Sequence, residues 1–212
     1  MNRRLILFAA GLLLATATYI LGWSTFFTVS SVVVKGTETQ ISSGIVVGQK
    51  LARVEPRAVE ARIEKLEWIA NAEVSRNWIN GNVVINVIER TPVAIFDNQV
   101  IDSNGKSFAI RTPVTTQLVQ IQASDLAIAV KAVSFYVSLP NDLKSAIRVI
   151  KVRSTGALVL ETDRGGKKLE IRWGIDTEKE LKLRVYKEVI ALPENQSIKR
   201  VDVSAPRAPI VK

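Results

Sequence analysis

The chain opens with a long apolar run. Residues 5–27 carry no charged side chain, and Arg3 and Arg4 lie directly before them. As a helix rising about 1.5 Å per residue, this stretch would measure about 34 Å, enough to cross a hydrocarbon layer of about 30 Å. Basic residues that flank a span favour the cytoplasmic side. The pattern therefore predicts a cytoplasmic tail over residues 1–4, one transmembrane helix over residues 5–27, and folded domains outside the membrane.

A cleaved signal peptide is the alternative interpretation of this run. Basic residues, an apolar core and the small-residue pattern Ala15-Thr16-Ala17 all fit that layout. The apolar residues do not stop at this pattern, however. They continue to Trp23, which with Tyr19 forms an aromatic pair of the kind found at a membrane interface. The length and the aromatic pair favour a retained anchor in the cell membrane.

Residues 28–91 alternate between strand and helix patterns. In order, they predict a strand over 29–34, a helix over 42–50, a helix over 56–66, and strands over 72–78 and 82–90. Pro56 suits the first turn of its helix, where Val59 and Ile63 form an apolar stripe. Asn80-Gly81 tolerates the positive φ values of a tight hairpin turn. Two helices on one side of a three-stranded sheet would make a small α+β domain.

The remaining residues combine many strand patterns with two helix patterns. They predict a hairpin over 100–108, strands over 113–121, 147–152, 157–162, 168–173 and 198–204, helices over 125–138 and 176–192, and an extended tail over 205–212. Ser124 is a candidate N-cap of the first helix. In the second helix, Glu178 and Lys182 are predicted to form an i,i+4 ion pair on the outer face.

The amino-acid composition limits the catalytic and metal-binding chemistry that the chain can perform. The 212 residues contain neither histidine nor cysteine, which excludes histidine-based triads, thiol nucleophiles and the common zinc sites. Carboxylates near predicted turns, such as Asp97 and Asp163, come with no supporting motif. We therefore expect no catalytic residue, no metal site, no cofactor and no small-molecule substrate. An exported enzyme is the least supported of the possible functions.

The chain is basic, with a formal net charge of +9. Its basic residues are dispersed along the sequence, which favours a solvated surface over a binding patch. Weak attraction to anionic lipid headgroups or wall polymers is the alternative. Nucleic acid is not expected as a partner, because the folded domains are predicted to lie outside the membrane.

One stretch carries a set of motifs that belong together. It contains Leu66-Glu67-Trp68-Ile69, then Ala72-Glu73-Val74-Ser75-Arg76-Asn77-Trp78, an alternating strand from Val83, and Glu89-Arg90-Thr91-Pro92-Val93-Ala94. This set resembles the signature of the FtsQ/DivIB family of bacterial cell-division proteins. Asp102 and Gly105 then match the family's Asp-x-x-Gly hairpin, and Val201-Asp202-Val203 is similar to its final strand. Glu67 and Ile79 depart from the family pattern, which often has proline at both places.

The resemblance implies an α+β fold in three parts. A single N-terminal transmembrane helix would be followed by a polypeptide-transport-associated (POTRA) domain of β-α-α-β-β order over residues 28–91. A mostly antiparallel β domain with flanking helices would occupy residues 92–204, and residues 205–212 would form an extended C-terminal tail. The family motif implies structural roles for Trp68, Arg76, Glu89, Arg90, Pro92, Asp102 and Gly105.

The resemblance also implies a function. It implies a non-catalytic, single-pass scaffold at the division septum that sits in the lipid bilayer and recruits coiled-coil proteins of the FtsB/DivIC and FtsL type. The mechanism would be strand addition at an exposed sheet edge. The residues expected on that edge are Ile198, Lys199, Arg200, Val201, Asp202, Val203 and Ser204. On this hypothesis, Val201→Pro removes a ladder N–H and abolishes pairing. The alternative function is a POTRA-type, chaperone-like module in protein secretion or envelope assembly.

Overall fold

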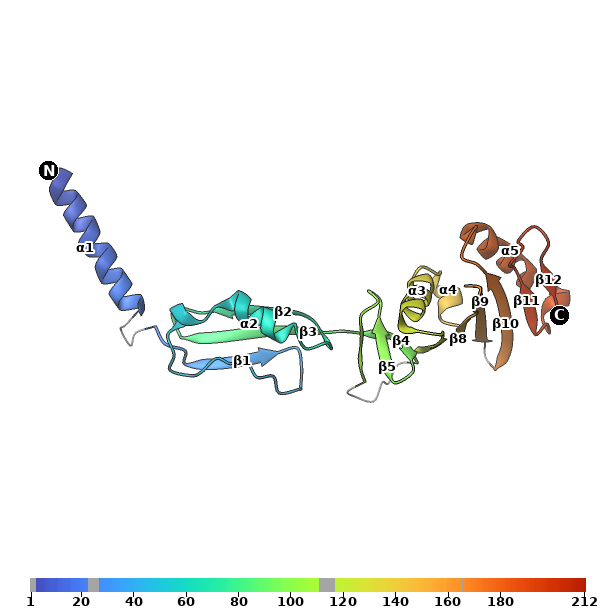
Figure 1. The fold of residues 1–212 in the computed structure, drawn as a ribbon, viewed down its shortest axis with the longest axis horizontal. Helices are drawn as coiled ribbons and strands as arrows, with labels where there is room; N and C mark the ends of the chain where they lie inside the picture. The colour runs from blue at the N-terminus through green and yellow to red at the C-terminus, as the bar shows by residue number, and fades with distance from the viewer. Residues whose placement is uncertain (1–2, 23–26, 111–116, 165) are drawn as a thin grey trace. The chain divides into compact units, whose positions relative to one another are not determined.

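The structure of the chain is a computed structural model that describes residues 3–22, 27–110, 117–164 and 166–212 (Figure 1). The chain divides into two compact units, residues 1–90 and residues 91–212. Each unit contains its own sheet and its own hydrophobic core. The fold is therefore α+β, as the sequence predicts.

Helix α1 covers Arg3–Gly22. In the described part of the chain, no helix combines the length and the apolar character that crossing a membrane requires. Residues 23–26, which include the expected interfacial residue Trp23, lie outside the described residues.

The first unit holds a three-stranded sheet. Its elements are β1 (Ser31–Lys35), the 3₁₀ turn η1 (Leu51–Arg53), α2 (Pro56–Ile63), β2 (Ile69–Arg76) and β3 (Asn82–Glu89). The strand order is β1-β3-β2, with β1 parallel and β2 antiparallel to the central strand. Pro56 begins α2 as predicted. Val59 and Ile63 on this helix pack into a core with Ile69 and Ile85.

The helix predicted over residues 42–50 is wrong. Gly44 and Gly48 adopt φ angles of 69° and 92°, which lie in the left-handed region and cannot continue an α-helix. The segment instead pairs with the chain before β1, because the Gly48 N–H donates to the Val29 carbonyl at 2.8 Å. In the described residues 27–90, the structure thus has the α-helix α2 and the 3₁₀ turn η1 where the POTRA pattern predicts two helices.

The second unit is built on one nine-stranded sheet. Its strands are β4 (Pro92–Phe96), β5 (Gln99–Asp102), β6 (Ser107–Ala109), β7 (Val119–Gln122), β8 (Ile147–Val152), β9 (Leu158–Arg164), β10 (Lys167–Gly174), β11 (Arg200–Asp202) and β12 (Ile210–Val211). Their order in the sheet is β12-β11-β10-β9-β8-β7-β4-β5-β6. Helices α3 (Leu126–Val137), α4 (Asn141–Lys144) and α5 (Lys179–Ala191), with the 3₁₀ turn η2 (Pro193–Asn195), complete the unit.

The pairing of this sheet is mixed, with an antiparallel majority. The parallel pairs are β4·β7, β7·β8 and β10·β11. Helices lie in the chain between two of these pairs, α3 and α4 between β7 and β8, and α5 between β10 and β11, as parallel crossovers require (Figure 1). The core contains Trp173 from β10, which packs edge-on against Phe135 from α3 with ring centroids 5.4 Å apart. This core fixes the position of β10 and, through it, of β11.

Both long helices of this unit begin differently from the prediction. The N-cap of α3 is Asp125, whose carboxylate accepts from the Ile128 N–H at 2.9 Å, so Ser124 is not the cap. The N-cap of α5 is Glu178, in a left-handed conformation.

Lys182 on α5 is not on the outer face of the helix, where the sequence places it. It is buried and donates to the carbonyls of Trp173 and Ile175. Burial lowers the pKa of Lys182.

Candidate functional site: an edge of the nine-stranded sheet

The expected partner-binding residues lie on and around β11, between α5 and the final described strand. The odd-numbered residues around β11 form the hydrogen bonds to β10. The Glu170 N–H donates to the Lys199 carbonyl at 2.9 Å, and the Val203 N–H donates to the Arg172 carbonyl at 2.9 Å. Backbone groups alternate along a strand, so those of Arg200 and Asp202 face the opposite side. We call that side the acceptor edge of β11, because a further strand can pair with it there.

The structure corrects the predicted edge in three respects. Strand β11 spans Arg200–Asp202, which is shorter than the predicted strand over residues 198–204. Val201 and Val203 are fully buried in the core, so their side chains are not available to a partner. The backbone of Val201 is on the β10 side, so Val201→Pro would disrupt the domain instead of testing the edge.

The two ends of the predicted strand are excluded from it by local hydrogen bonds. The Ile198 N–H donates to the Asn195 carbonyl of η2, which keeps Ile198 in a turn. At the other end, the Asp202 carboxylate accepts from both the N–H and the hydroxyl of Ser204, at 3.0 and 2.6 Å. Lys199 and Ser204 are exposed on either side of β11.

The acceptor edge is already occupied by the chain itself. Residues 205–212, which we call the return segment, were predicted to be an extended tail, yet β12 pairs antiparallel with β11. The Arg200 N–H donates to the Lys212 carbonyl and the Lys212 N–H donates to the Arg200 carbonyl, both at 3.0 Å. Figure 1 shows β12 beside β11 at this side of the sheet. The sequence held a signal for this turn in Pro206, followed by the β-branched pair Ile210-Val211.

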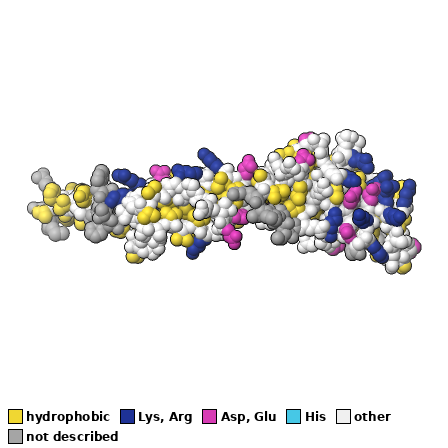
Figure 2. All heavy atoms as spheres, turned by 90° about the horizontal axis from the view of Figure 1, so that it is seen from below, with side chains coloured by type: hydrophobic (Ala, Val, Ile, Leu, Met, Phe, Trp, Pro, Cys, Tyr) yellow, Lys and Arg dark blue, Asp and Glu magenta, His cyan; other side chains and the backbone are white. Residues whose placement is uncertain are grey.

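Charged side chains form a ladder across the strands next to this edge. The Glu170 carboxylate accepts from Arg200 at 2.7 Å and from Arg172 at 3.1 Å, which links β10 to β11. Partial burial raises the pKa of Glu170, but the hydrogen bonds from both arginines outweigh it and hold the pKa below its usual value. Lys151 and Glu161 pair on the neighbouring strands β8 and β9. Figure 2 shows Lys and Arg side chains gathered at this end of the molecule, with Asp and Glu among them.

Motif residues in the first unit hold its elements together. The Arg76 guanidinium on β2 donates to the Val54 carbonyl at 2.7 Å and to the Leu51 carbonyl at 3.1 Å. The Arg90 N–H donates to the carbonyl of Trp68, whose side chain packs on the core. Glu89 is exposed at the end of β3, where its backbone lies opposite Ile69 of β2.

Motif residues in the second unit shape its first hairpin. Pro92 begins β4, a position where a missing N–H is tolerated, and it lies opposite Asp102. The buried Asp102 carboxylate accepts from the N–H groups of Asn104 and Lys106, at 2.9 and 2.8 Å. Gly105 has φ of 82°, and a side chain there would come within 2.7 Å of Val130. Both observations require glycine at this turn.

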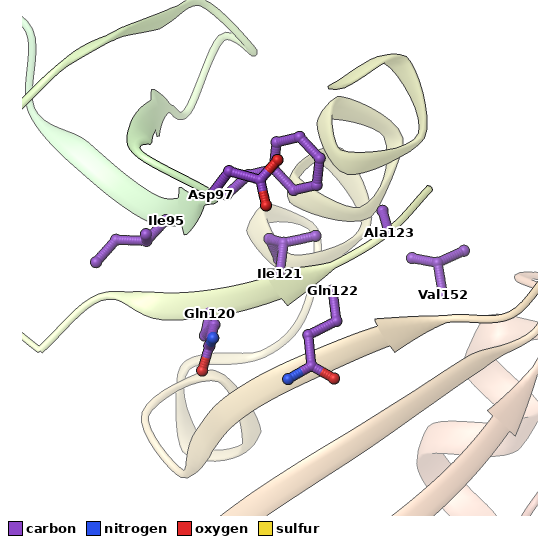
Figure 3. Close-up of a pocket in the computed structure, with 8 residues that line it drawn as sticks. Ile95, Asp97, Gln120, Ile121, Gln122, Ala123 and Val152 are labelled. Atoms are coloured by element: carbon purple, nitrogen blue, oxygen red, sulfur yellow. The ribbon is translucent and has the colours of Figure 1, made fainter. Parts of the chain in front are cut away.

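A hollow beside the ends of β4 and β7 has polar side chains that could contact a small molecule. Asp97, Gln120 and Gln122 supply its polar groups. Figure 3 shows the two glutamines on the opposite side of β7 from Asp97, so the polar groups do not converge on one point. Within the described residues, no group of three acidic side chains could hold a metal ion.

The arrangement of these parts defines the class of protein. A POTRA domain of the FtsQ type matches residues 27–90, and the model described as "Cell division protein FtsQ/DivIB, C-terminal" matches residues 93–204. Cell division protein FtsQ of Streptomyces venezuelae is 29% identical over 97% of this chain and 83% of its own length, and that of Streptomyces coelicolor is 28% identical over 98% and 87%. The chain belongs to the FtsQ/DivIB family of cell division proteins, which confirms the resemblance drawn from the motifs.

Proposed function

We propose that this chain is a non-catalytic scaffold of the division machinery. Its β domain receives a strand from a partner of the FtsB/DivIC type, which brings a companion of the FtsL type to the septum. The observation that carries the proposal is the acceptor edge of β11, where the backbone groups of Arg200 and Asp202 accept an antiparallel strand. Strand addition uses such groups for affinity and the adjacent side chains for specificity.

The side chains around this edge fit selective strand addition. Arg200 and Asp202 lie on the partly exposed face, and Glu170 fixes the Arg200 guanidinium at 2.7 Å. Val201 and Val203 pack into the core, which holds the edge rigid. An incoming strand therefore meets a fixed backbone, with a cation and an anion at successive outward positions.

In this proposal the N-terminal run anchors the scaffold in the cell membrane. Residues 5–27 are uncharged and follow Arg3 and Arg4, which favours a cytoplasmic N-terminus and folded domains outside. The POTRA unit, residues 28–91, then follows the anchor directly in the chain, and the β domain, residues 92–204, carries the binding edge.

Site-specific photo-crosslinking in dividing cells tests the edge. A photoreactive residue replaces Lys199 or Ser204, which are exposed at the two ends of β11, and a matched control replaces Lys187 on α5. We expect cross-links to the FtsB/DivIC-type protein of the same organism from the first two positions and none from the third. Cross-links only from Lys187, or none from any position while the chain still reaches the septum, would exclude β11 as the docking edge.

A further inference from the structure

The return segment uses the same backbone groups that a partner strand would need. The Lys212 carbonyl accepts from the N–H groups of Arg200 and Lys199, at 3.0 and 2.8 Å, and the Lys212 N–H returns a bond to Arg200. The register places Ile210 opposite Asp202 and Val211 opposite Val201. A second strand cannot pair with these groups while the return segment does, so the two states exclude each other.

The pairing is short and little of it is buried. Strand β12 has two residues, and the Ile210 and Val211 side chains keep 57% and 38% of their surface exposed. Pro209 directly precedes this two-residue strand. A longer, proline-free strand would make more ladder bonds along the same edge.

The turn that brings the return segment back is held by contacts that water can replace. The Ala208 N–H donates to the Ala205 carbonyl at 2.9 Å, and Pro206 is the buried residue of the turn. Arg207 pairs with Glu178 at 2.8 Å, but their side chains are 78% and 43% exposed. Ion pairs this exposed contribute little. The segment is therefore ordered, yet weakly held.

We propose that the return segment is a displaceable cover of the acceptor edge, which the partner strand must remove in order to bind. This inference rests on the proposed function, because it takes β11 as the docking strand. The cover protects an edge that would otherwise be open to unwanted pairing, and it makes binding depend on the length and sequence of the incoming strand. The apparent affinity equals the intrinsic affinity multiplied by the fraction of molecules in which the edge is open.

A pair of proline variants tests this without changing the length of the chain. The register places the Ile210 N–H toward β11 and the Val211 N–H away from it. Ile210→Pro therefore opens the cover, and Val211→Pro is the matched control. We expect the detergent-solubilised full chain with Ile210→Pro to bind the purified FtsB/DivIC-type protein about tenfold more tightly, and Val211→Pro to change the affinity far less.

A disulfide tests the closed state. The chain has no cysteine, so the one intramolecular disulfide that Asp202→Cys with Ile210→Cys can form locks β12 onto β11, and non-reducing electrophoresis separates it from cross-linked dimers. Antiparallel partners of this kind lie about 5.5 Å apart at Cα, which suits a disulfide. We expect the oxidised chain to lose partner binding and the reduced chain to regain it. Amide exchange at Arg200 should be slow in the oxidised chain and faster with Ile210→Pro.

The outcomes separate this inference from the proposed function. Equal binding by Ile210→Pro and Val211→Pro, or equal binding before and after reduction, overturns the cover while cross-links from Ser204 still support the edge. Weaker binding by Ile210→Pro means that the return segment is part of the docking surface, which also overturns the cover. Absence of binding in every variant, together with absent cross-links, overturns the proposed function itself.

Discussion

The two sheets of this chain close an outer edge by different means. In the POTRA sheet, side chains of α2 and its C-cap residue bond to β2: the Glu60 carboxylate accepts from the Val74 N–H at 2.8 Å, and that of the C-cap Glu64 accepts from the Ala72 N–H at 3.2 Å. In the β domain, a separate backbone segment bonds to β11. The backbone of α2 is held in the core through Val59 and Ile63, so the carboxylates stay beside β2, whereas the short return segment is itself largely exposed.

This difference separates a structural edge from a functional one. Open edges invite pairing with other chains, and proteins protect them. The edge of β2 is protected by elements that also build the core, since Val59 and Ile63 of α2 pack beneath the same sheet. The edge of β11 is protected by residues that are largely exposed. Substitutions at the first edge should therefore affect folding, and substitutions at the second should affect binding.

We expect the largest loss of folding stability from substitution of Arg76, which joins β2 to the segment around η1 through the carbonyls of Leu51 and Val54. Arg76→Ala leaves both partly buried acceptors without this charged donor, and we expect a loss of about 2–3 kcal/mol in the free energy of unfolding. Urea unfolding of the full chain measures it. Arg57→Ala is the control, because Arg57 is exposed on α2 and its loss should cost less than about 0.5 kcal/mol. Equal losses would mean that the bonds of Arg76 do not hold the edge.

We expect the next largest loss of folding stability from substitution of Glu60. Glu60→Ala leaves the Val74 N–H without its acceptor in a part-buried position, and we expect a loss of about 1–2 kcal/mol. Glu60→Gln retains an acceptor oxygen at the same place and should keep most of the stability. Amide exchange at Val74 provides the local readout, faster in the alanine variant than in the glutamine variant. Unchanged exchange in both variants would show that the carboxylate is not what closes this edge.

Much of the fold was predictable from local patterns. Strand β8 matches its predicted range, and the apolar stripe of α2 follows from periodicity. At the predicted Asn80-Gly81 turn only Gly81 has a positive φ, and bonds between Asn77 and Asn82 and between Gly81 and Asn77 close a longer loop than the predicted tight turn. The helix predicted over residues 42–50 is an exception, because Gly44 and Gly48 have left-handed φ angles. Apolar spacing favoured a helix there, but the long-range bond from Gly48 to Val29 decided the conformation. A bond between distant segments leaves no periodic trace in the sequence.

The candidate site was predictable only in part, for the same reason. The sequence located β11 near Val201, because alternation is a local property. It did not show that β12 occupies the acceptor edge, because two residues are too few for a recognisable strand pattern. Lys182 was placed on the outer face from its helical position, yet it donates to the carbonyls at the end of β10 and is buried. Both errors concern contacts made by tertiary structure.

The smallest effect is expected at Glu170, the carboxylate that links β10 to β11 through Arg200. Its pKa lies below the usual value in the folded chain, so the unfolded chain takes up protons first as the pH falls. The stabilisation is therefore present at neutral pH and is lost in acid, below about pH 5. At pH 7 we expect Glu170→Gln to be less stable than the parent by under about 1 kcal/mol, because the pair is partly exposed.

The pH dependence distinguishes this linkage from a packing effect. Thermal unfolding of the parent and of Glu170→Gln from pH 7 to pH 3 should show two melting curves that approach each other as the carboxylate is protonated. Glu180→Gln on α5 is the control, since Glu180 is exposed. A difference that stays constant down to pH 3 would assign the effect to lost packing. Because Glu170 orients Arg200 without bonding the backbone of β11, partner affinity should change less in this variant than in Ile210→Pro.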